Sequence, residues 1–280
     1  MVTVVITGAS GFVGRALTAY LTNSGLTAIP VSRHSLPGMT RVQDYSQAPA
    51  GDFLIHLAEE PDRCKVNQLG DSYMLYASSM IKALSSRFHQ RIIYASSGVV
   101  YGDENEGPCR VGMPVVATDV YSKSKLLNEQ IVLDSGGAVV RLSNLFGDGM
   151  STNNVMSDII RQVPGTGPLR VRDDKPVRDY LHVLDAASAF GLLVKSTCCG
   201  IVNVGSGIGT SVRRLAELSL LAVRQDDREI IATEPSSRRS INILDISETT
   251  KLLDWSPAVS LKDQLAQLIF NKAKSLHEET

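Results

Sequence analysis

Short apolar, β-branched runs alternate with longer segments of helical periodicity along the first half of the chain. The runs at 2–7, 27–32, 41–44, 53–57 and 91–95 predict strands that are buried on both faces. The segments between them predict helices, notably 12–23, 65–87 and 120–133. Strands that alternate with helices in this way predict an α/β fold with a doubly wound parallel sheet.

The pattern changes after Gly147. Residues 148–176 combine one short helix, a link rich in glycine and proline, and a strand-like Leu-Arg-Val at 169–171. Further on, amphipathic helices are expected at 183–195, 211–223 and 260–274, with a strand at 201–204. The second half therefore predicts a more mixed arrangement than the first.

Composition narrows the class of protein. The 280 residues are 43% hydrophobic and 20% charged, with a formal net charge of −1, which argues against wholesale binding to nucleic acid or anionic membranes. No apolar run approaches the ~20 residues of a membrane span, and the first ten residues favour a strand over a signal peptide. The four cysteines lack the spacing of metal ligands or of a disulfide framework. We expect a cytoplasmic protein without a metal site.

Three glycines separate the first strand from the first helix, at positions 8, 11 and 14. Glycine permits a tight turn at the first position, close approach of a pyrophosphate at the second and close helix packing at the third. The amino terminus of the helix then offers N–H groups and a positive dipole end to phosphates. This turn predicts a dinucleotide site formed by Gly8, Ser10, Gly11, Phe12, Val13 and Gly14.

The residues after the second strand bear on the choice of coenzyme. No Asp or Glu lies between Val31 and Gln43 to hold a ribose 2′-hydroxyl. Arg33, after Ser32, suits a 2′-phosphate, although a solvated loop arginine is an equal alternative. NADP(H) is therefore favoured over NAD(H). The adenine and pyrophosphate are expected to pass beside Ser32, Arg33, Asp44, Tyr45, Leu57 and Ala58.

Tyr121 and Lys125 lie four residues apart on the helix predicted at 120–133, which places them on one face. A nearby ammonium favours the charged form of a phenol and would lower the tyrosine pKa from its usual ~10. A Tyr-x-x-x-Lys pair on an exposed helix is common, so the spacing gains meaning only beside the glycine turn. Ser96 and Ser97, at the end of the strand predicted at 91–95, would face the same coenzyme.

Eight sequence motifs, which include the glycine turn and the Tyr121–Lys125 pair, follow one another along nearly the whole chain. They are TGASGFVG at 7–14, HLAE at 56–59, SSGVVYG at 96–102, YSKSK at 121–125, RLSNLFG at 141–147, RDYLHVLD at 178–185, NVGSG at 203–207 and LLDWSP at 252–257. Together they resemble the extended branch of the short-chain dehydrogenase/reductase superfamily, which comprises nucleotide-sugar epimerases, dehydratases and reductases. The resemblance implies a Rossmann-type sheet with a smaller, mixed α/β substrate lobe.

The resemblance also implies domains and roles. Residues 1–147 would form the dinucleotide-binding domain, with 177–206 returning to it, and 148–176 and 207–280 the substrate lobe. Tyr121 would be the acid/base, Lys125 would hold the nicotinamide ribose, and Ser97, four residues before Tyr101, would bind the reacting oxygen. The nucleotide-diphosphate sugar would be held by Ser97, Asn144, Asn154, Arg178 and Arg238. Open alternatives are a helix cap for Asn154, a salt bridge from Arg178 to Asp179 or Asp185, and Arg239 in place of Arg238.

Departures from the family pattern narrow the reaction. Dehydratases of this branch carry Asp and Glu after the catalytic Ser or Thr, where this chain has Gly98 and Val99. Enzymes that also epimerise beside the carbonyl carry a cysteine at the position of Val99. The remaining expectation is reduction of the 4-keto group of a nucleotide-linked sugar, 6-deoxy sugars included, with 4-epimerisation as the alternative. The family also implies a homodimer, here through helices 65–87 and 120–134.

Overall fold

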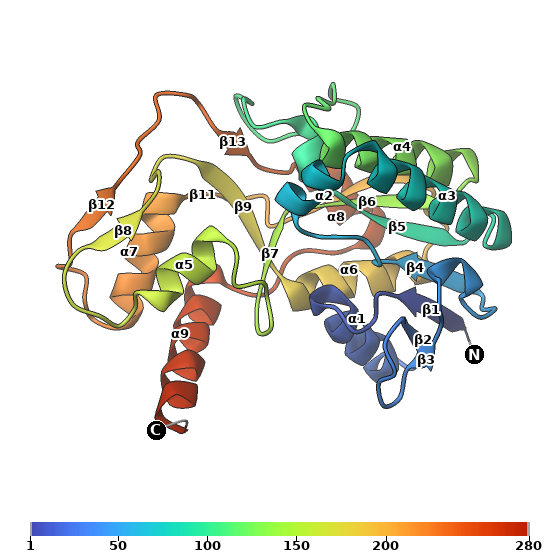
Figure 1. Ribbon diagram of the computed structural model, residues 1–280, viewed down its shortest axis with the longest axis horizontal. Coiled ribbons are helices and arrows are strands. Elements are labelled where there is room, and N and C mark those ends of the chain that lie inside the picture. The colour runs from blue at the N-terminus through green and yellow to red at the C-terminus, as the bar shows by residue number, and fades with distance from the viewer. Residues whose placement is uncertain (1, 279–280) are drawn as a thin grey trace.

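The computed structural model describes residues 2–278, with side chains to residue 272, and its centre is a parallel sheet of seven strands. The strand order is β10-β6-β5-β4-β1-β2-β3. Figure 1 labels all of these strands except β10. The strands are β1 (Thr3–Thr7), β2 (Thr27–Ser32), β3 (Thr40–Arg41), β4 (Phe53–His56), β5 (Ile92–Ser97), β6 (Ala138–Leu142) and β10 (Gly200–Val204). The predicted Rossmann-type α/β fold is confirmed.

Helices cover both faces of this sheet. On one face α1 (Phe12–Asn23) packs with α6 (Val183–Lys195), and on the other α3 (Asp71–Arg87) packs with α4 (Val120–Asp134), preceded by the short α2 (Arg63–Leu69) (Figure 1). Each face buries its own apolar core, around Leu17 and Phe190 on the first and around Ile81 and Tyr94 on the second. The doubly wound arrangement thus follows from strands that are apolar on both sides.

The smaller part of the molecule lies beside the carboxyl ends of the large sheet (Figure 1). It contains β7 (Asn144–Phe146), β9 (Val177–His182), β11 (Gly209–Ser211) and β13 (Ile241–Asn242), in which β9 pairs with the other three. A second pair joins β8 (Leu169–Val171) to β12 (Ile230–Ala232). Around them lie α5 (Val155–Arg161), α7 (Val212–Ala222) and α9 (Leu261–Glu278), while α8 (Ser247–Leu253) packs near β10. Strand β9 joins this sheet and β10 joins the large one; the division into domains stays a prediction.

Three differences between the predicted elements and the structure bear on the site. The helix expected at 65–87 is two helices, because Gly70 has a φ of +63°, which ends α2 and starts α3. The strand expected at 41–44 is only β3, since Asp44 instead caps the 3-10 helix η1 (Tyr45–Gln47). Strand β5 runs on to Ser97, after which Gly98–Tyr101 form the 3-10 helix η2.

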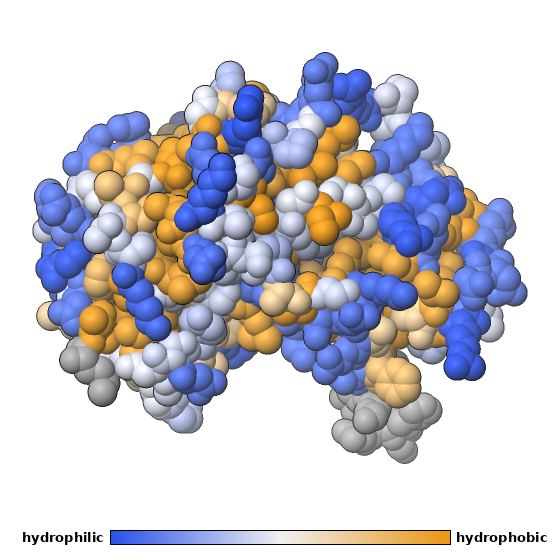
Figure 2. Space-filling model, turned by 180° about the vertical axis from the view of Figure 1, so that it is seen from behind, coloured by the Kyte–Doolittle hydropathy of each residue, from blue (hydrophilic) through white to orange (hydrophobic). Residues whose placement is uncertain are grey.

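The surface is of the ordinary mixed kind. Seen from behind, hydrophilic residues predominate along the outline and hydrophobic ones are interspersed among them (Figure 2). Within residues 2–278, no helix combines the length and the apolar character needed to cross a membrane.

Candidate active site

A cavity of about 550 Å³ lies at the carboxyl ends of β1, β4 and β5, beside the start of α4. Open parallel sheets bind ligands at this edge. The predicted residues that line the cavity are Gly8, Ser10, Gly11, Phe12, Val13, Gly14, Arg33, Tyr45, Leu57, Ser97, Tyr121, Lys125 and Asn144. One cavity therefore connects the glycine turn to the predicted catalytic residues.

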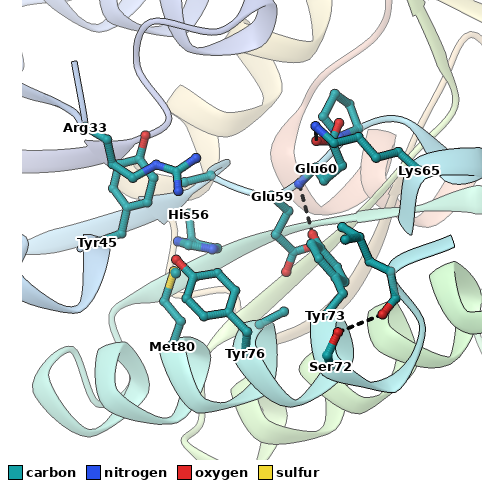
Figure 3. Close-up of a pocket in the computed structure, with 14 residues that line it drawn as sticks. Arg33, Tyr45, His56, Glu59, Glu60, Lys65, Ser72, Tyr73, Tyr76 and Met80 are labelled. Atoms are coloured by element: carbon teal, nitrogen blue, oxygen red, sulfur yellow. Dashed lines mark hydrogen bonds and ion pairs between the residues drawn. The ribbon is translucent and has the colours of Figure 1, made fainter. Parts of the chain in front are cut away.

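A second cavity of about 490 Å³ adjoins the first and shares Arg33 and Tyr45 with it (Figure 3). Tyr73 and Tyr76 project into it from α3 (Figure 3). Ala58, which was predicted to border the coenzyme, lines this second cavity. The two cavities together extend the binding surface away from Tyr121, in the direction where the adenosine end of a dinucleotide was expected.

The glycine turn has the shape that a dinucleotide requires. Gly8 has a φ of +74°, a left-handed conformation that other residues seldom adopt. A Cβ atom on Gly14 would lie 2.3 Å from the carbonyl oxygen of Gly8, so only glycine lets α1 pack this close to the turn. The amino terminus of α1 follows Gly11 and has no side-chain cap. Its N–H groups and dipole therefore face the cavity ready for phosphate oxygens, and the residues fit NAD(P).

Ser32 supports this turn from behind. Its side chain is fully buried and does not line either cavity. Its hydroxyl donates to Ser10 Oγ (3.4 Å) and accepts a hydrogen bond from the backbone N–H of His34 (3.0 Å). The hydroxyl thus links the ends of β1 and β2.

Arg33 and Tyr45 belong to the wall that the two cavities share, together with Glu59, Glu60 and Pro61. The Arg33 guanidinium lies 5.5 Å from the centroid of the Tyr45 ring, within the range of a cation–π contact. Asp44 does not line either cavity. Its carboxylate accepts from Ser46 N (2.8 Å) and from the Tyr76 hydroxyl (3.3 Å), and the hydrogen bonds from Ser46 lower the pKa of Asp44. Of the two residues expected near adenine, Tyr45 reaches the cavity and Asp44 holds the loop behind it.

Tyr121, Lys125 and Ser97 converge on the first cavity from two elements. The Lys125 ammonium lies 5.8 Å from the centroid of the Tyr121 ring and donates to the carbonyl oxygen of Ala95 (2.9 Å). Ser97 ends β5, and its hydroxyl accepts a hydrogen bond from Val99 N (3.3 Å). A phenol, an ammonium and a hydroxyl around one cavity are the parts needed for proton transfer to a bound carbonyl.

Ser96, the alternative to Ser97, is occupied elsewhere. Its hydroxyl donates to Glu129 Oε1 (2.5 Å), and Glu129 forms a buried two-point ion pair with Arg141 (2.7 and 3.0 Å). Ser96 is only 3% exposed. Ser96 is therefore committed to the buried Glu129–Arg141 pair, whereas Ser97 lines both the first and the third cavity together with Tyr121.

The start of α4 is fixed by residues that the sequence analysis did not assign. Asp119 and Ser122 form a capping box, in which Asp119 accepts from Ser122 N (2.9 Å). Asn67 accepts from the N–H of Tyr121 (3.0 Å) and donates to Asp119 (2.9 Å), while Arg63 pairs with Asp119 (2.5 Å). Although burial would raise it, these hydrogen bonds hold the pKa of the Asp119 carboxyl well below its usual range. An Asp-x-x-Ser cap is visible in a sequence, but the contribution from α2 is not.

Glu59 belongs to the HLAE motif, but no role was predicted for it from the sequence. Its side chain is 9% exposed and its carboxylate lies 2.7 Å from the Lys125 ammonium. Burial alone would raise the pKa of Glu59, but the attraction of Lys125 and hydrogen bonds from Lys125 and Tyr94 lower it. In the sequence, Glu59 is recognisable only as an acidic residue just after a strand. That position does not reveal that its partner is Lys125, 66 positions further along.

A third cavity of about 260 Å³ contains the predicted substrate residues Asn144 and Arg178, together with Ser97 and Tyr121. Arg178 donates to the carbonyl oxygen of Ser240 (3.0 Å), and burial lowers the pKa of its guanidinium. This cavity extends the site from Tyr121 toward the smaller part of the molecule.

The ion-pair partner suggested for Arg178 was wrong. Its guanidinium lies 3.8 Å from Asp103. Asp179 instead accepts from the backbone of Ser206 (2.7 Å), and Asp185 accepts from the N–H of Ala258 (3.1 Å). Both carboxylates are therefore used to fix loops.

Arg238 and Asn154 do not line this cavity. Arg238 is exposed and pairs with Asp103 (2.5 Å) and Glu104 (2.6 Å), which places it at the cavity edge, whereas Arg239 lies 3.8 Å from Glu106. Asn154 caps α5 by accepting from Ser157 N (2.9 Å), the alternative that the sequence left open, and it lines a separate cavity. A contact of Asn154 with substrate stays a prediction.

A family model matches residues 4–205, and its description is the NAD dependent epimerase/dehydratase family. Among curated proteins, the chain is 29% identical to GDP-6-deoxy-D-mannose reductase of Pseudomonas aeruginosa, over 98% of each chain. The match covers the glycine turn and the residues around Tyr121. It confirms the resemblance that the motifs indicated.

Two solved structures illustrate the range of relatives. One is RMD from Pseudomonas aeruginosa complexed with NADPH, with 25% identity, a TM-score of 0.83 and coverage of 96% of this chain and 98% of that one. The other is UDP-glucose-4-epimerase from Stenotrophomonas maltophila with bound NAD and formylated UDP-arabinopyranose. It has 20% identity, a TM-score of 0.84 and coverage of 98% and 100%. The fold is thus shared by proteins of different activity.

Proposed function

The chain belongs to the NAD dependent epimerase/dehydratase family, and from that premise we propose that it reduces the 4-keto group of a nucleotide-linked sugar, 6-deoxy sugars included. The observation that carries this proposal is the convergence of Tyr121, Lys125 and Ser97 on a cavity that begins at the glycine turn. The full-length similarity to GDP-6-deoxy-D-mannose reductase supports a reduction of this type.

In this proposal Ser97 and Tyr121 hydrogen-bond the carbonyl oxygen of the substrate. Bound NADPH would supply the hydride to the carbonyl carbon. Tyr121 gives its phenolic proton to the oxygen, so that an alcohol forms, and the Lys125 ammonium stabilises the phenolate that remains. Tyr121 then regains a proton from solvent.

NADP(H) is the proposed coenzyme, and Arg33 is the residue that would distinguish it from NAD(H). Its exposed guanidinium lies over Tyr45 at the shared wall of the two coenzyme cavities, where it would meet a 2′-phosphate. No acidic side chain at this strand end offers an acceptor for a ribose 2′-hydroxyl. The NADPH complex of the RMD structure supports this choice.

The substrate would enter from the side of the third cavity. Arg178 and Arg238 would bind the diphosphate from two sides, because guanidinium groups pair with phosphates through two hydrogen bonds. Asn144, between the first and third cavities, would contact the sugar or the diphosphate. Gly98 and Val99 carry no acid group beside Ser97, which argues against a 4,6-dehydratase.

A 4-epimerase with tightly held NAD is the alternative, because curated relatives of this chain also include UDP-glucose 4-epimerases. The two functions differ in what happens to the coenzyme. A purified epimerase carries bound NAD and interconverts sugars without added reductant. A reductase releases its coenzyme and consumes NADPH in proportion to product.

The direct experiment is incubation with NADPH and a panel of dTDP-, UDP-, GDP- and CDP-linked 4-keto sugars, following the loss of coenzyme absorbance at about 340 nm. We expect turnover with at least one sugar. Tyr121→Phe should lower turnover by at least about a hundredfold, since it removes the proton donor. NADPH binding, measured by its fluorescence, should stay within about threefold of wild type. Unchanged turnover in this variant would refute the role of Tyr121.

A homodimer through α3 and α4, in the cytoplasm, remains part of the proposal. Leu75 on α3 and Leu127 on α4 expose 65% and 39% of their surface, and they would be covered by a second copy. Sedimentation equilibrium tests this arrangement, and charged substitution of Leu75 should shift the protein toward monomer.

A further inference from the structure

The Glu59 carboxylate is enclosed by polar partners from two neighbouring elements. The Tyr94 hydroxyl, on β5, donates to it at 2.9–3.0 Å. Asn128, on α4, donates from its amide at 2.7 Å, and Lys125 lies at 2.7 Å. The carboxylate is therefore held in one position, close to the start of the coenzyme cavity that it lines.

The Lys125 ammonium is held just as firmly. It donates to Ala95 O (2.9 Å) and pairs with Glu59, and it lies over the Tyr94 ring at 5.0 Å from the centroid. An ammonium has three N–H donors, and these two partners account for two of them. The third is left for the cavity, where Tyr121 lies.

Glu59 and Lys125 remain an ion pair despite their burial. Burial alone would lower the pKa of Lys125, but the attraction of Glu59 raises it well above its usual value. The pKa of Glu59 is lowered by the same pairing. Tyr121 therefore faces an ammonium whose charge is largely offset by a carboxylate.

Among the other titratable groups around this pair, a histidine and two tyrosines are neutral, and a neighbouring acid has a partner of its own. His56, at the end of β4, is buried, and burial lowers its pKa to about 4. Tyr73 on α3 has a pKa raised to about 12 by burial and then by Glu59, and burial also raises that of Tyr94. Glu60, the neighbouring acid, pairs with Lys65 at 2.5 Å. Glu59 is thus the charge that opposes Lys125 within this cluster.

We propose that Glu59 is a positioning residue that aims Lys125 at the coenzyme and sets the pH range over which Tyr121 transfers its proton. The inference rests on the proposed function and deepens it. During reduction the O–H bond of Tyr121 breaks and an O–H bond forms on the substrate, while the coenzyme is oxidised and the carbonyl carbon is reduced. The phenolate that is left shares Lys125 with the Glu59 carboxylate. Two anions around one ammonium favour the return of the proton to the Tyr121 oxygen.

The test is Glu59→Gln, which keeps the size and hydrogen-bonding reach of the side chain and removes its charge. The variant leaves Lys125 without an opposing charge, so the phenolate form of Tyr121 becomes easier to reach. For ketone reduction, we expect the basic limb of the kcat profile to move to lower pH by about one unit. Tyr94→Phe removes a hydrogen bond to Glu59 but no charge, and its profile should stay within about 0.3 units of wild type. A merely structural role would move both profiles alike or neither.

A second readout requires no substrate. The absorbance of tyrosinate near 295 nm is titrated for wild type and Glu59→Gln, each compared with the same protein carrying Tyr121→Phe. The difference isolates Tyr121, and its midpoint should be lower by about one pH unit in Glu59→Gln. If wild type reduces no 4-keto sugar, the proposed function fails and this titration still decides the role of Glu59. An unmoved midpoint overturns the inference even where the enzyme is active.

Folding is followed by circular dichroism, because loss of one partner from a buried ion pair is destabilising. Where Glu59→Gln does not fold, Glu59→Asp takes its place. Asp keeps the charge but is one methylene shorter, so it withdraws the carboxylate from Lys125. The midpoint should then move in the same direction by a smaller amount. A midpoint equal to that of wild type would overturn the inference.

Discussion

His56 makes the stability of this protein depend on pH below neutrality. It ends β4, is 1% exposed, and stacks on Tyr94 with 6.2 Å between ring centroids. Its Nδ1 lies 2.8 Å from the Thr7 hydroxyl, and its Nε2 has no hydrogen-bond partner among the residues that the structure describes. Burial lowers the pKa of His56 from 6.5 to about 4; Glu59 opposes this effect and Lys125 adds to it. A protonated imidazole is therefore strongly disfavoured in the folded state.

The direction and the size of the change in the free energy of unfolding with pH follow from proton linkage. Between pH 6.5 and about 4 the unfolded chain binds a proton at His56 that the folded chain does not, so the free energy of unfolding falls as pH falls. At about 1.4 kcal/mol per pH unit, the full window corresponds to about 3 kcal/mol, and acidification to pH 5 to about 2 kcal/mol. Relative to typical stabilities of 5–15 kcal/mol, this is a substantial loss.

Urea unfolding at pH 7.5 and pH 5.0 measures the effect, with His56→Asn as the test variant. Asn keeps a polar atom for Thr7 but does not titrate. The drop in unfolding free energy between the two pH values should be about 2 kcal/mol larger in wild type than in this variant. Carboxylates such as Asp119 titrate in both proteins, so their contributions cancel. His89→Asn, at an exposed position, is the matched control and should behave as wild type. Equal pH dependence in wild type and His56→Asn would refute the reasoning.

Two further predictions concern the ends of the binding surface. Arg33→Ala should raise the KM for NADPH about tenfold, since it removes a charge-assisted contact to the 2′-phosphate, while the KM for NADH stays within about twofold. Steady-state kinetics with both coenzymes check this, and an equal loss for both would show that Arg33 does not read the phosphate. Asp103→Asn should lower the KM for the nucleotide sugar about threefold with kcat unchanged, because a carboxylate then no longer competes with the diphosphate for Arg178 and Arg238. A KM that rises would show instead that Asp103 orients these arginines.

Those parts of the site that depend on residues close together in the sequence could be predicted from it. The glycine turn needs only the spacing of Gly8, Gly11 and Gly14 between a strand and a helix, and Tyr121 and Lys125 need only helical periodicity. The structure brings these groups to one cavity, because the parallel sheet places its carboxyl ends together. Local pattern and fold topology together were enough for this part of the site.

Gly70 shows where local pattern was insufficient. Apolar positions continue at helical spacing through 65–87, and a single glycine is tolerated within a helix at a cost of about 1 kcal/mol. The structure instead uses the left-handed φ of Gly70 to separate α2 from α3. Because α2 is separate, Asn67 and Arg63 can contact the start of α4. Such tertiary contacts stabilise the break, and they do not show in the hydrophobic periodicity of the sequence.

Pairings between distant residues could not be predicted at all. Glu59 meets Lys125, and Arg178 meets Asp103, only because the fold brings separate strand ends and loops together. Motif reasoning proposed Asp179 and Asp185 for Arg178 because they are close in sequence, yet both carboxylates are used by the backbone of other loops. The acidic partner of a functional cation is a property of the folded chain.

Two ion pairs at the site, Glu59–Lys125 and Asp103–Arg238, differ in their exposure to solvent. The difference matches the group that each side of the cavity would bind. The side chains of Glu59 and Lys125 are each 9% exposed, so solvent and salt screen their attraction little. We therefore expect this ion pair to persist when ligands bind and dissociate. Asp103 and Arg238 are 36% and 58% exposed, where ion pairs are weak and readily exchanged. A diphosphate with its own charge-assisted hydrogen bonds would displace the Asp103 carboxylate at little cost. The permanent pair thus lies beside the proposed proton-transfer residues, and the exchangeable pair lies where a charged substrate would enter.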